Sequence, residues 1–590
     1  MNEGHDAFDG FLEHVLDELS LRVPEFPTQM GLFETSGTRI PQDRFTDISD
    51  AAALDRQQTL RNLSSRLAEF EHDQLSSEQR TTAEVLGFFF DYVHERDWIG
   101  IKGEDFLHHE YLIRPSVGLQ SDLPLFLSDL HPMRHQQDAM DYVDRLRFIA
   151  PMLSEAGDLI VERQHNGLLP PTFLIRDTIR EISEFTAIEA RDNIVCRTFA
   201  EKSEELPDVS AAQRERMLAS IEKEIRDTTY PAYSQLANTL SLQEKAAYDD
   251  PGLWRLPNGE AYYDFLLHAA TTTALSASEI HEIGLAETEK LEEEIISASS
   301  NLGYNIHNIG DCHRLLNADQ KHSRSESVET PQDIVDKVES LIASIEGHLP
   351  SLFHHLPTSK VMVKPIPEFA ESSRNQSYQP PSLDGSRPGL FELNVGQLLE
   401  AGKFDTELPT LVYHEIYPGH HLQLALAMET EALPMARRII TFDAYIEGWA
   451  KYAEELPWTQ GINTDPHWRL ARMHRELIST VNLVLDTGIH AMRWGVKQSM
   501  DFLQDHTGLG EAFTRYLVHR SASVPAQMCS YKIGMLKMLE LRDKMSKAQG
   551  ASFDIRDFHD VILRNGAVPL KVLDTIVDRE IEISSRPATT

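Results

Sequence analysis

Three histidines in the segment LVYHEIYPGHHLQ, residues 411–423, are the side chains best suited to hold a metal ion: His414, His420 and His421. Two imidazoles can share one zinc ion when they lie one helical turn apart, at positions i and i+4. Position i+4 from His414 is Pro418, which has no ligand atom. On an ideal helix, His420 and His421 would lie about 9 Å and about 10.5 Å further along the axis. A regular helix therefore cannot bring either histidine to the same ion as His414.

Pro418 and Gly419 change this geometry, because proline removes a backbone donor and glycine accepts conformations that other residues avoid. If this pair forms an irregular turn, His414 and His420 return to a separation of about one helical turn. We favour His420 as the second ligand, with His421 as the alternative. The segment therefore predicts a kinked helix with a two-histidine metal site. The competing interpretation is a polar histidine cluster at a helix end.

Glu447 is the predicted third ligand. It lies in AYIEGWAKYAEEL, residues 444–456, an apolar and aromatic helical segment in which a carboxylate is costly to bury unless it is paired or bound to a metal. Zinc hydrolases with two histidine ligands often take a glutamate from a following helix and leave the fourth position for water. Glu454, two turns after Glu447, is a candidate to orient a ligating imidazole, and the alternative for it and for Glu455 is a solvated carboxylate. We expect one zinc ion per chain.

Glu415 is the predicted general base. It directly follows His414 and therefore points to another side of the helix, where it can face the open position of the metal. There it would take a proton from zinc-bound water, whose pKa the metal lowers to about 7, and later pass it to the leaving amine. The alternative is a surface carboxylate without a catalytic role.

The elements that must position these residues are mostly helices. Apolar residues recur at spacings of three and four, with charges between them, in residues 54–72, 212–240 and 330–349. Residues 360–396 differ, because VMVKPI and GLFELNV alternate around a loop rich in Pro, Gly, Ser and Asn, which predicts a strand pair. We expect a mostly α fold with a small β-sheet next to the metal site. An edge strand could bind an extended peptide there, and a surface hairpin is the alternative.

Composition excludes several classes of partner. The net charge of −38 and the isoelectric point near 5.0 argue against nucleic acid or an anionic membrane surface as the main partner. The three cysteines are far apart and show no paired spacing, so neither a disulfide framework nor a thiolate metal site is predicted. The N-terminus shows no secretory pattern and no apolar run is long enough to cross a membrane, so we expect a cytoplasmic protein. The pattern does not predict an oligomeric state.

Several motifs, in the same order, resemble the bacterial family catalogued as domain of unknown function 885 (DUF885). They are YHEIYPGHHLQ, AYIEGWAKYAEE, LVLDTGIHAMRWG, PAQMCSYKIG and FDIRDFHDVILRNGAVPLKVL. The similarity also includes SYQPPSLDGSRPGLFELNV, NGEAYYDFLLHAATTTALSASEIHEIGLAE and VPEFPTQMG, so it spans nearly the whole chain. We therefore expect residues 1–590 to form a single catalytic unit, with 1–355 and 356–590 as candidate helical and metal-site lobes.

The family in turn resembles zinc peptidases with a His-Glu motif and a downstream glutamate ligand (gluzincins), including oligopeptidases, carboxypeptidase Taq and angiotensin-converting enzyme. The resemblance implies a large helical shell around a deep central channel. Those enzymes read His-Glu-X-Gly-His, and aligning the Gly-His pair with Gly419 and His420 supports His420 over His421. This chain departs from the family pattern at Ile416 and Tyr417, where Gly-Val is typical. The bulkier side chains are expected to change the shape of the pocket.

Hydrolysis also requires a donor for the oxyanion that forms during attack. Tyr531 in SYKIG is one candidate, by resemblance to the tyrosine of related helical zinc peptidases, and Lys532 beside it would receive a substrate carboxylate. His490 is the second candidate, since it lies four residues after Asp486 and a helix would place this acid and imidazole on one face. The alternatives are a core aromatic for Tyr531 and a pair that ties helices together for Asp486 and His490.

Three further side chains are predicted to line the cleft beside the small sheet, although a rigid loop would explain them equally well: Arg387, Tyr378 and Asn394. Together these features predict a zinc-dependent hydrolase of peptide or peptide-like amide bonds that uses activated water and no covalent intermediate. One alternative is an amidase specialised for a single small metabolite. The other is a catalytically silent helical metal-binding protein, which the presence of Glu415 disfavours because a pure binding site needs no base.

Overall fold

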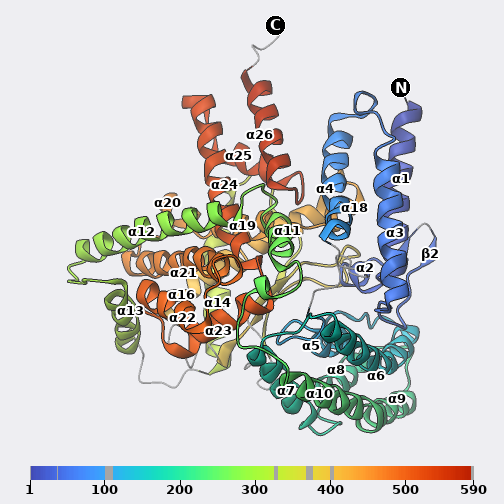
Figure 1. Cartoon of the computed structure of the whole chain (residues 1–590). Helices are drawn as coiled ribbons and strands as arrows, with labels where there is room; N and C mark the ends of the chain where they lie inside the picture. Colours follow the sequence, from blue (N-terminus) through green and yellow to red (C-terminus); the bar gives the residue numbers. More distant parts are fainter. Residues whose placement is uncertain are drawn as a thin grey trace. The chain divides into compact units, whose positions relative to one another are not determined.

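The protein is mostly helical and contains a small β-sheet, which confirms the predicted fold class (Figure 1). The computed structural model describes residues 2–35, 37–99, 111–323, 330–366, 376–396, 398 and 404–585. The expected shell around a deep central channel stays a prediction.

The chain folds into two compact units, and the boundary between them lies near residue 250. The first comprises Met1–Asp250, Arg255–Asn258 and Ser382–Ser386, and the second comprises Pro251–Trp254, Gly259–Pro381 and Arg387–Thr590. The second unit therefore contains the predicted metal segment together with the helices between residues 259 and 355, which the sequence had assigned to the other candidate lobe. That the whole chain acts as a single catalytic unit stays a prediction.

The first unit is built from helices with buried apolar faces. Its core contains Leu146, Leu153, Phe199 and Tyr233, which are all at most 1% exposed. The segment predicted at 212–240 forms two helices with a short π-helical turn between them, just before a proline that cannot donate a backbone hydrogen bond. The helices are α1 (Asn2–Arg22), α2 (Glu25–Gln29), α3 (Asp50–Leu67), α4 (Ser77–Ile99), α5 (Leu119–Leu125), α6 (Gln136–His165), α7 (Thr172–Thr186), α8 (Ile194–Glu204), α9 (Ala211–Glu224) and α10 (Tyr230–Glu244). A short antiparallel pair joins β1 (Glu34–Thr35) to β2 (Thr38–Arg39).

The second unit is organised around one long buried helix, α21 (Pro466–His490), which packs against α12 (Ala277–Asn301). Leu477, Val481 and Leu485 of α21 are fully buried. The remaining helices are α11 (Gly259–Thr271), α13 (Ile309–Ser323), α14 (Pro331–Glu346), α16 (Phe404–Glu415), α17 (His420–Glu429), α18 (Met435–Ile439), α19 (Asp443–Ala453), α20 (Leu456–Thr459), α22 (Val496–Thr507), α23 (Glu511–Ser523), α24 (Gln527–Gln549), α25 (Ile555–Leu563) and α26 (Leu570–Ser585). The helical segment predicted at 330–349 forms α14, whose first turn is closed by a capping box.

A three-stranded sheet precedes the metal segment. The two predicted strands form β3 (Val361–Pro365) and β5 (Gly389–Leu393), and β4 (Ser377–Gln379) is a third strand that the sequence analysis did not identify. β5 lies in the centre, parallel to β3 and antiparallel to β4. The predicted pair is therefore not a hairpin, because the connection between the two strands is long enough to return the chain in the same direction. Every residue of β5 is buried, as expected for a central strand.

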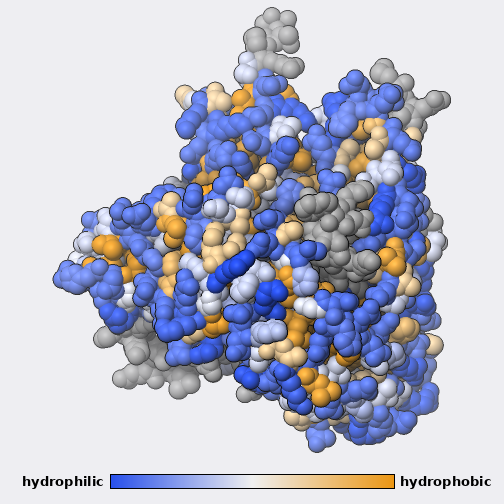
Figure 2. All heavy atoms as spheres, in the orientation of Figure 1, coloured by the Kyte–Doolittle hydropathy of each residue, from blue (hydrophilic) through white to orange (hydrophobic). Residues whose placement is uncertain are grey.

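Polar residues cover much of the surface in view, with smaller hydrophobic areas between them (Figure 2). This distribution agrees with the net charge of −38. Within the described part of the chain, no helix combines the length and the apolar character needed to cross a membrane.

Candidate metal centre

A sharp turn separates α16 from α17 at the predicted kink. α16 ends at Glu415 and α17 begins at His420. Gly419 packs so tightly against the preceding helix that a Cβ atom built on it would lie 1.8 Å from the carbonyl oxygen of His414. The indole nitrogen Nε1 of Trp449 donates a hydrogen bond of 3.0 Å to the carbonyl oxygen of Pro418 and ties the turn to α19. The turn therefore requires glycine and is held by a neighbouring helix.

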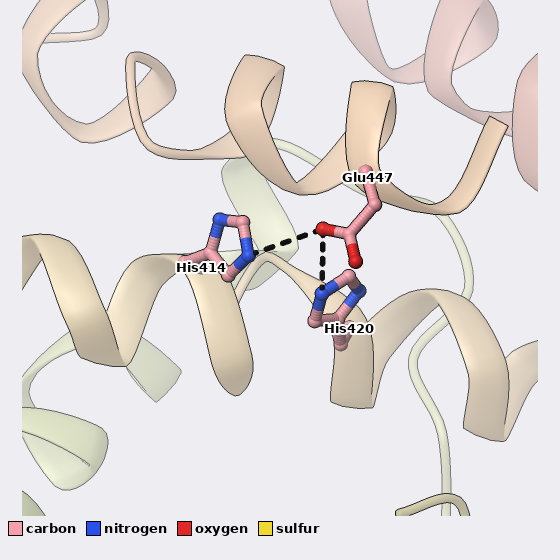
Figure 3. A group of neighbouring side chains, drawn as sticks. All are labelled: His414, His420 and Glu447. Atoms are coloured by element: carbon pink, nitrogen blue, oxygen red, sulfur yellow. Dashed lines mark ion pairs between the residues drawn. The ribbon is translucent and has the colours of Figure 1, made fainter. Parts of the chain in front are cut away.

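This turn brings His414 and His420 together with Glu447. The Nε2 atoms of the two imidazoles each lie 3.5 Å from Oε2 of Glu447. One ligand atom from each of the three residues lies within 4.8 Å of the others. Figure 3 shows the three side chains, from α16, α17 and α19, pointing toward one another. Residues far apart in sequence thus converge as the sequence analysis expected.

The chemistry of this group fits a divalent metal ion. Two imidazoles and one carboxylate form the donor set of zinc sites that keep an open fourth position. Oε2 of Glu447 is buried and forms no hydrogen bond with any described residue, so it is a buried acceptor that lacks a donor. Burial alone would raise the pKa of Glu447, but the two imidazoles outweigh burial and hold this pKa well below its usual range. The carboxylate is therefore ionised, as a metal ligand must be.

A second carboxylate supports His414 from the other side of the ring. Nδ1 of His414 lies 2.9 Å from Oε1 of Glu454, which is only 1% exposed. Nζ of Lys451 donates hydrogen bonds of 2.9 and 2.8 Å to the two oxygens of Glu454 and neutralises it. When the ring is neutral, as a metal ligand must be, this arrangement places its proton on Nδ1 and leaves Nε2 free to ligate. Sequence reasoning identified Glu454 but missed Lys451, although their i, i+3 spacing on a helix favours such a pair.

Glu415 lies at the end of α16, directly after His414. Its side chain is 8% exposed, and its carboxylate forms no hydrogen bond or ion pair with any described residue. Burial would lower the pKa of His414, but Glu447, Glu454 and the charge of Glu415 raise it to about 9. The carboxylate of Glu415 is therefore close to the ligand group and is not engaged elsewhere.

His421, the alternative second ligand, points away from this group. Its Nδ1 accepts a hydrogen bond of 2.8 Å from the hydroxyl of Tyr378, and its Nε2 donates one of 3.1 Å to the carbonyl oxygen of Ser359. Burial lowers its pKa to about 4, so the ring is neutral. Both ring nitrogens of His421 are therefore occupied. His421 points away from the metal group because consecutive residues of a helix face different directions. Of the two candidates, only His420 meets His414.

The residues predicted to line a cleft lie around the small sheet. Tyr378 belongs to β4 and is engaged by His421. Arg387 precedes β5, and its charge opposes the rise that burial causes in the pKa of Tyr378. Asn394 follows β5 and is fully buried. Tyr378 and Asn394 are thus placed to support the sheet, while their role toward a substrate stays a prediction.

Tyr531 lies beside the metal group because α19 and α24 touch through their backbones. A Cβ atom on Gly448 would lie 2.5 Å from the backbone of Gly534, so the two helices cross at these glycines. Glu447 directly precedes Gly448, and Tyr531 lies one turn before Gly534. Burial raises the pKa of Tyr531, and the charge of Glu447 raises it further. The phenol is therefore protonated and able to donate a hydrogen bond.

Lys532 does not share the environment of Tyr531. Its Nζ forms ion pairs of 2.8 Å with Glu476 and 3.2 Å with Glu287, and its side chain is 2% exposed. Adjacent residues on a helix point about 100° apart, so Lys532 faces α12 and α21 instead of the metal group. The prediction that Lys532 receives a substrate carboxylate is corrected on this ground.

Asp486 and His490 do not form the predicted pair. Asp486 accepts hydrogen bonds of 2.9 Å from the hydroxyl of Ser521 and from the backbone amide of Ala526. Nδ1 of His490 accepts a hydrogen bond of 3.1 Å from the backbone amide of Leu253, and its Nε2 donates one of 3.1 Å to the carbonyl oxygen of Ser521. Both ring nitrogens of His490 are occupied by backbone groups, so it has no donor left for an oxyanion. These contacts match the alternative interpretation, in which the two residues tie helices together.

Two residues near the site were missed by sequence reasoning. Asp443 opens α19 one turn before Glu447, and burial together with the charge of Glu447 raises its pKa to about 6. The i, i+4 spacing of these two acids was the signal that could have identified it. Arg520 contacts the hydroxyl of Tyr531, and no local pattern in α23 distinguishes it from Arg515, the other arginine of that helix.

Comparisons with known proteins agree with the motif resemblance. The profile of a family described as "Bacterial protein of unknown function (DUF885)" matches residues 24–577. A solved structure described as "the putative lipoprotein from Colwellia psychrerythraea" superposes with a TM-score of 0.92 at 25% identity, covering 99% of this chain and 100% of that chain. A second solved structure, described as "a putative lipoprotein of unknown function from Shewanella oneidensis", has the same fold, with a TM-score of 0.70 at 17% identity over 96% of this chain and 99% of that chain. The comparison with curated proteins found no match.

These comparisons correct one expectation. The cytoplasmic location is wrong, because both similar structures are described with the words "putative lipoprotein", and lipoproteins are attached to membranes by lipid. The three cysteines carry no information about location, because Cys196, Cys312 and Cys529 are all buried and unpaired and such thiols do not distinguish one compartment from another. The match over nearly the whole length, together with the motifs gathered around the metal group, identifies this chain as a member of the bacterial DUF885 family.

Proposed function

We propose that this protein is a zinc-dependent hydrolase of peptide or peptide-like amide bonds. The observation that carries the proposal is the convergence of His414, His420 and Glu447, with ligand atoms within 4.8 Å, beside the unengaged carboxylate of Glu415. A binding site alone would require the ligands but not a neighbouring base. The proposed site thus combines a metal position with a group able to move a proton.

The three ligands would hold one zinc ion, which when bound polarises the scissile carbonyl and lowers the pKa of a coordinated water to about 7. Glu454 and Lys451 keep the His414 ring oriented with Nε2 toward Glu447. This fixed arrangement is needed because a metal site loses affinity when its histidines can rotate.

Glu415 acts as the general base in the proposed reaction. Its carboxylate takes a proton from the attacking water as the water oxygen bonds to the carbonyl carbon. The same proton passes to the amine nitrogen as the carbon–nitrogen bond breaks, so the carboxylate returns to its starting state. The products are a carboxylic acid and an amine, without a covalent enzyme intermediate.

Tyr531 is the proposed oxyanion donor. Its hydroxyl receives hydrogen bonds from Gln527 and Arg520, of 3.2 and 3.4 Å, which leave its own proton available. The developing negative charge on the former carbonyl oxygen would accept this proton as a hydrogen bond. The amidase of a single small metabolite remains the alternative function, because it would use the same residues with a different pocket.

Metal analysis combined with two substitutions tests the proposal. Protein purified without chelator should contain about one zinc per chain, and His414→Ala should lose it. Short peptides, dipeptides and N-acylated amino acids should be hydrolysed, and a chelator should stop this reaction. Glu415→Gln should retain zinc and reduce kcat about 10²- to 10⁴-fold.

Glu431→Gln, at an exposed glutamate outside the site, is the matched control and should retain full activity. A zinc-free wild-type protein that hydrolyses these substrates at the normal rate would reject the metal mechanism. Normal turnover by Glu415→Gln would reject the assignment of the base.

A further inference from the structure

Arg520, in the last turn of α23, is a cation without an anionic partner. Its Nη2 atom donates hydrogen bonds to Oε1 of Gln527 at 3.2 Å and to the hydroxyl of Tyr531 at 3.4 Å, and both acceptors are neutral. The side chain is partly buried, and no carboxylate among the described residues forms an ion pair with it. Sheltering a charge from water is costly unless an opposite charge compensates it.

Three other buried cations of the same unit each form an ion pair with a glutamate. Lys451 pairs with Glu454, Lys532 pairs with Glu476, and Arg472 also pairs with Glu476. A protein with a net charge of −38 has many carboxylates available for such pairs. The acceptors of Arg520, Gln527 and Tyr531, are neutral side chains, so an anion from outside the chain can supply the missing negative charge.

The position of Arg520 connects it to the proposed reaction. It contacts the hydroxyl of Tyr531, which lies beside Glu447 where α19 and α24 cross at Gly448 and Gly534. An anion bound by the guanidinium would thus lie next to the group that faces the reacting carbonyl.

The turn that carries Arg520 is held rigidly. Ala526, between α23 and α24, adopts the left-handed backbone conformation with φ of 68°, which costs energy in a residue other than glycine. Asp486 holds both sides of this turn through the hydroxyl of Ser521 and the amide of Ala526. His490 adds a hydrogen bond to the carbonyl oxygen of Ser521. Asp486 and His490, which do not act on substrate, therefore position the neighbours of Arg520.

We propose that Arg520 binds a substrate carboxylate located within one residue of the scissile amide bond, an inference that rests on the proposed function. A planar guanidinium forms two parallel hydrogen bonds with a carboxylate, and the hydrogen bonds of Arg520 to Gln527 and Tyr531 both use the single nitrogen Nη2. The substrates are then peptides cleaved at the carboxyl-terminal bond, or N-acyl amino acids. In both, the released amine is an α-amino acid with a free carboxylate.

Ligand binding tests this assignment apart from catalysis. The ligands are a panel of N-acetylated dipeptides as free acids and the same panel as carboxyl-terminal amides. Calorimetry with the zinc-loaded Glu415→Gln protein measures their Kd values without turnover. We expect the acids to bind about 30- to 100-fold more tightly than the amides, as typical for a hydrogen-bonded charge pair. Equal affinities, or no binding of any acid, would overturn the proposal.

Substitution of Arg520 then assigns the preference to this residue. In the same background, Arg520→Gln should reduce the acid-to-amide preference to about one, while zinc content and amide affinity stay unchanged. Arg515→Gln is the control, because Arg515 lies in the same helix but pairs with Glu511 at the surface. A full preference for acids in the Arg520→Gln protein would show that another group binds the carboxylate.

The two proposals fail in different ways. If the wild-type protein binds the acids but hydrolyses none of them, the hydrolase proposal fails, and Arg520 is left as a carboxylate-binding residue without a role in hydrolysis. If it hydrolyses acids and amides at the same kcat/KM, the hydrolase proposal stands and the role of Arg520 fails.

Discussion

At the scale of single residues, His414 is the side chain whose two ring nitrogens have different tasks. Nε2 faces Glu447 at 3.5 Å, and Nδ1 faces Glu454 at 2.9 Å. Glu454 therefore lies on the far side of the ring from the proposed metal and can act only by orienting the imidazole. Lys451 keeps this buried carboxylate ionised by pairing with both of its oxygens.

Replacing Glu454 tests this orienting role. Glu454→Gln removes the charge behind the imidazole, and partners of this kind typically contribute 10- to 100-fold to metal affinity. We therefore expect zinc to bind about 10- to 100-fold more weakly, as measured by competition with a chelator of known affinity. Glu455→Gln changes the neighbouring carboxylate, which does not contact His414, and should leave zinc affinity unchanged. Unchanged affinity in Glu454→Gln would mean that packing alone orients the ring.

At the scale of elements, two close backbone approaches position the site. Gly419 lets the chain turn against the end of α16, so that α17 begins with His420 facing His414. Gly448 and Gly534 let α19 and α24 cross in contact, which places Glu447 beside Tyr531. In Figure 1, α19 and α24 lie next to each other in the second unit. A side chain at any of these glycines would separate groups that must meet.

Gly419→Ala tests the turn. The new methyl group would lie 1.8 Å from the carbonyl oxygen of His414, a backbone atom that cannot move without shifting α16. We expect zinc content to fall well below one per chain and the free energy of unfolding to decrease by about 2 kcal/mol or more, as for other strained backbone sites.

Gly157→Ala is the matched control, because a Cβ at Gly157 in α6 meets no atom within 4 Å. This substitution should increase stability slightly, by about 0.5–1 kcal/mol, and should not affect zinc. Full zinc content in Gly419→Ala would show that the turn tolerates a side chain and that the two histidines are held together by other contacts.

At the scale of the whole molecule, stability depends on pH through histidines that are buried without charge. His559 in α25 is fully buried, accepts a hydrogen bond of 2.9 Å from the hydroxyl of Tyr452 and donates one of 2.8 Å to the carbonyl oxygen of Leu352. Burial lowers its pKa to about 4, below the ordinary value of 6.5. Between these two values the unfolded chain binds a proton that the folded protein does not.

Lowering the pH therefore destabilises the folded protein through His559. The contribution of His559 is fully present above pH 6.5 and is lost as the pH falls toward 4. The loss amounts to about 3 kcal/mol over this range, since each pKa unit corresponds to about 1.4 kcal/mol. Urea unfolding at pH 7.5 and pH 4.5 should therefore show a smaller pH dependence in His559→Gln than in the wild type. His14→Gln, at a partly exposed histidine, should keep the wild-type dependence. An identical pH dependence in all three proteins would contradict a neutral buried His559.

Much of the candidate site could be predicted from local sequence patterns. His414, His420 and the Pro-Gly turn lie within one short segment, so their relation depends on helix geometry and on the properties of proline and glycine. Glu447 stood out because an acid in an apolar helix needs a partner. The helical periodicity likewise determined the mostly α fold, since it reports which face of each segment is buried.

Directions and partners were decided only by the tertiary structure. Lys532, Asp486 and His490 have the residue types of a catalytic site, yet packing between α12, α21, α23 and α24 gives them buried partners instead. Arg520 shows the reverse, because nothing in α23 distinguishes it until folding places it beside Tyr531 without a carboxylate. Sequence by itself determined which groups could act, since residue type and local spacing are read along the chain. Which of them meet depended on contacts between helices far apart in sequence, and such contacts leave no local pattern.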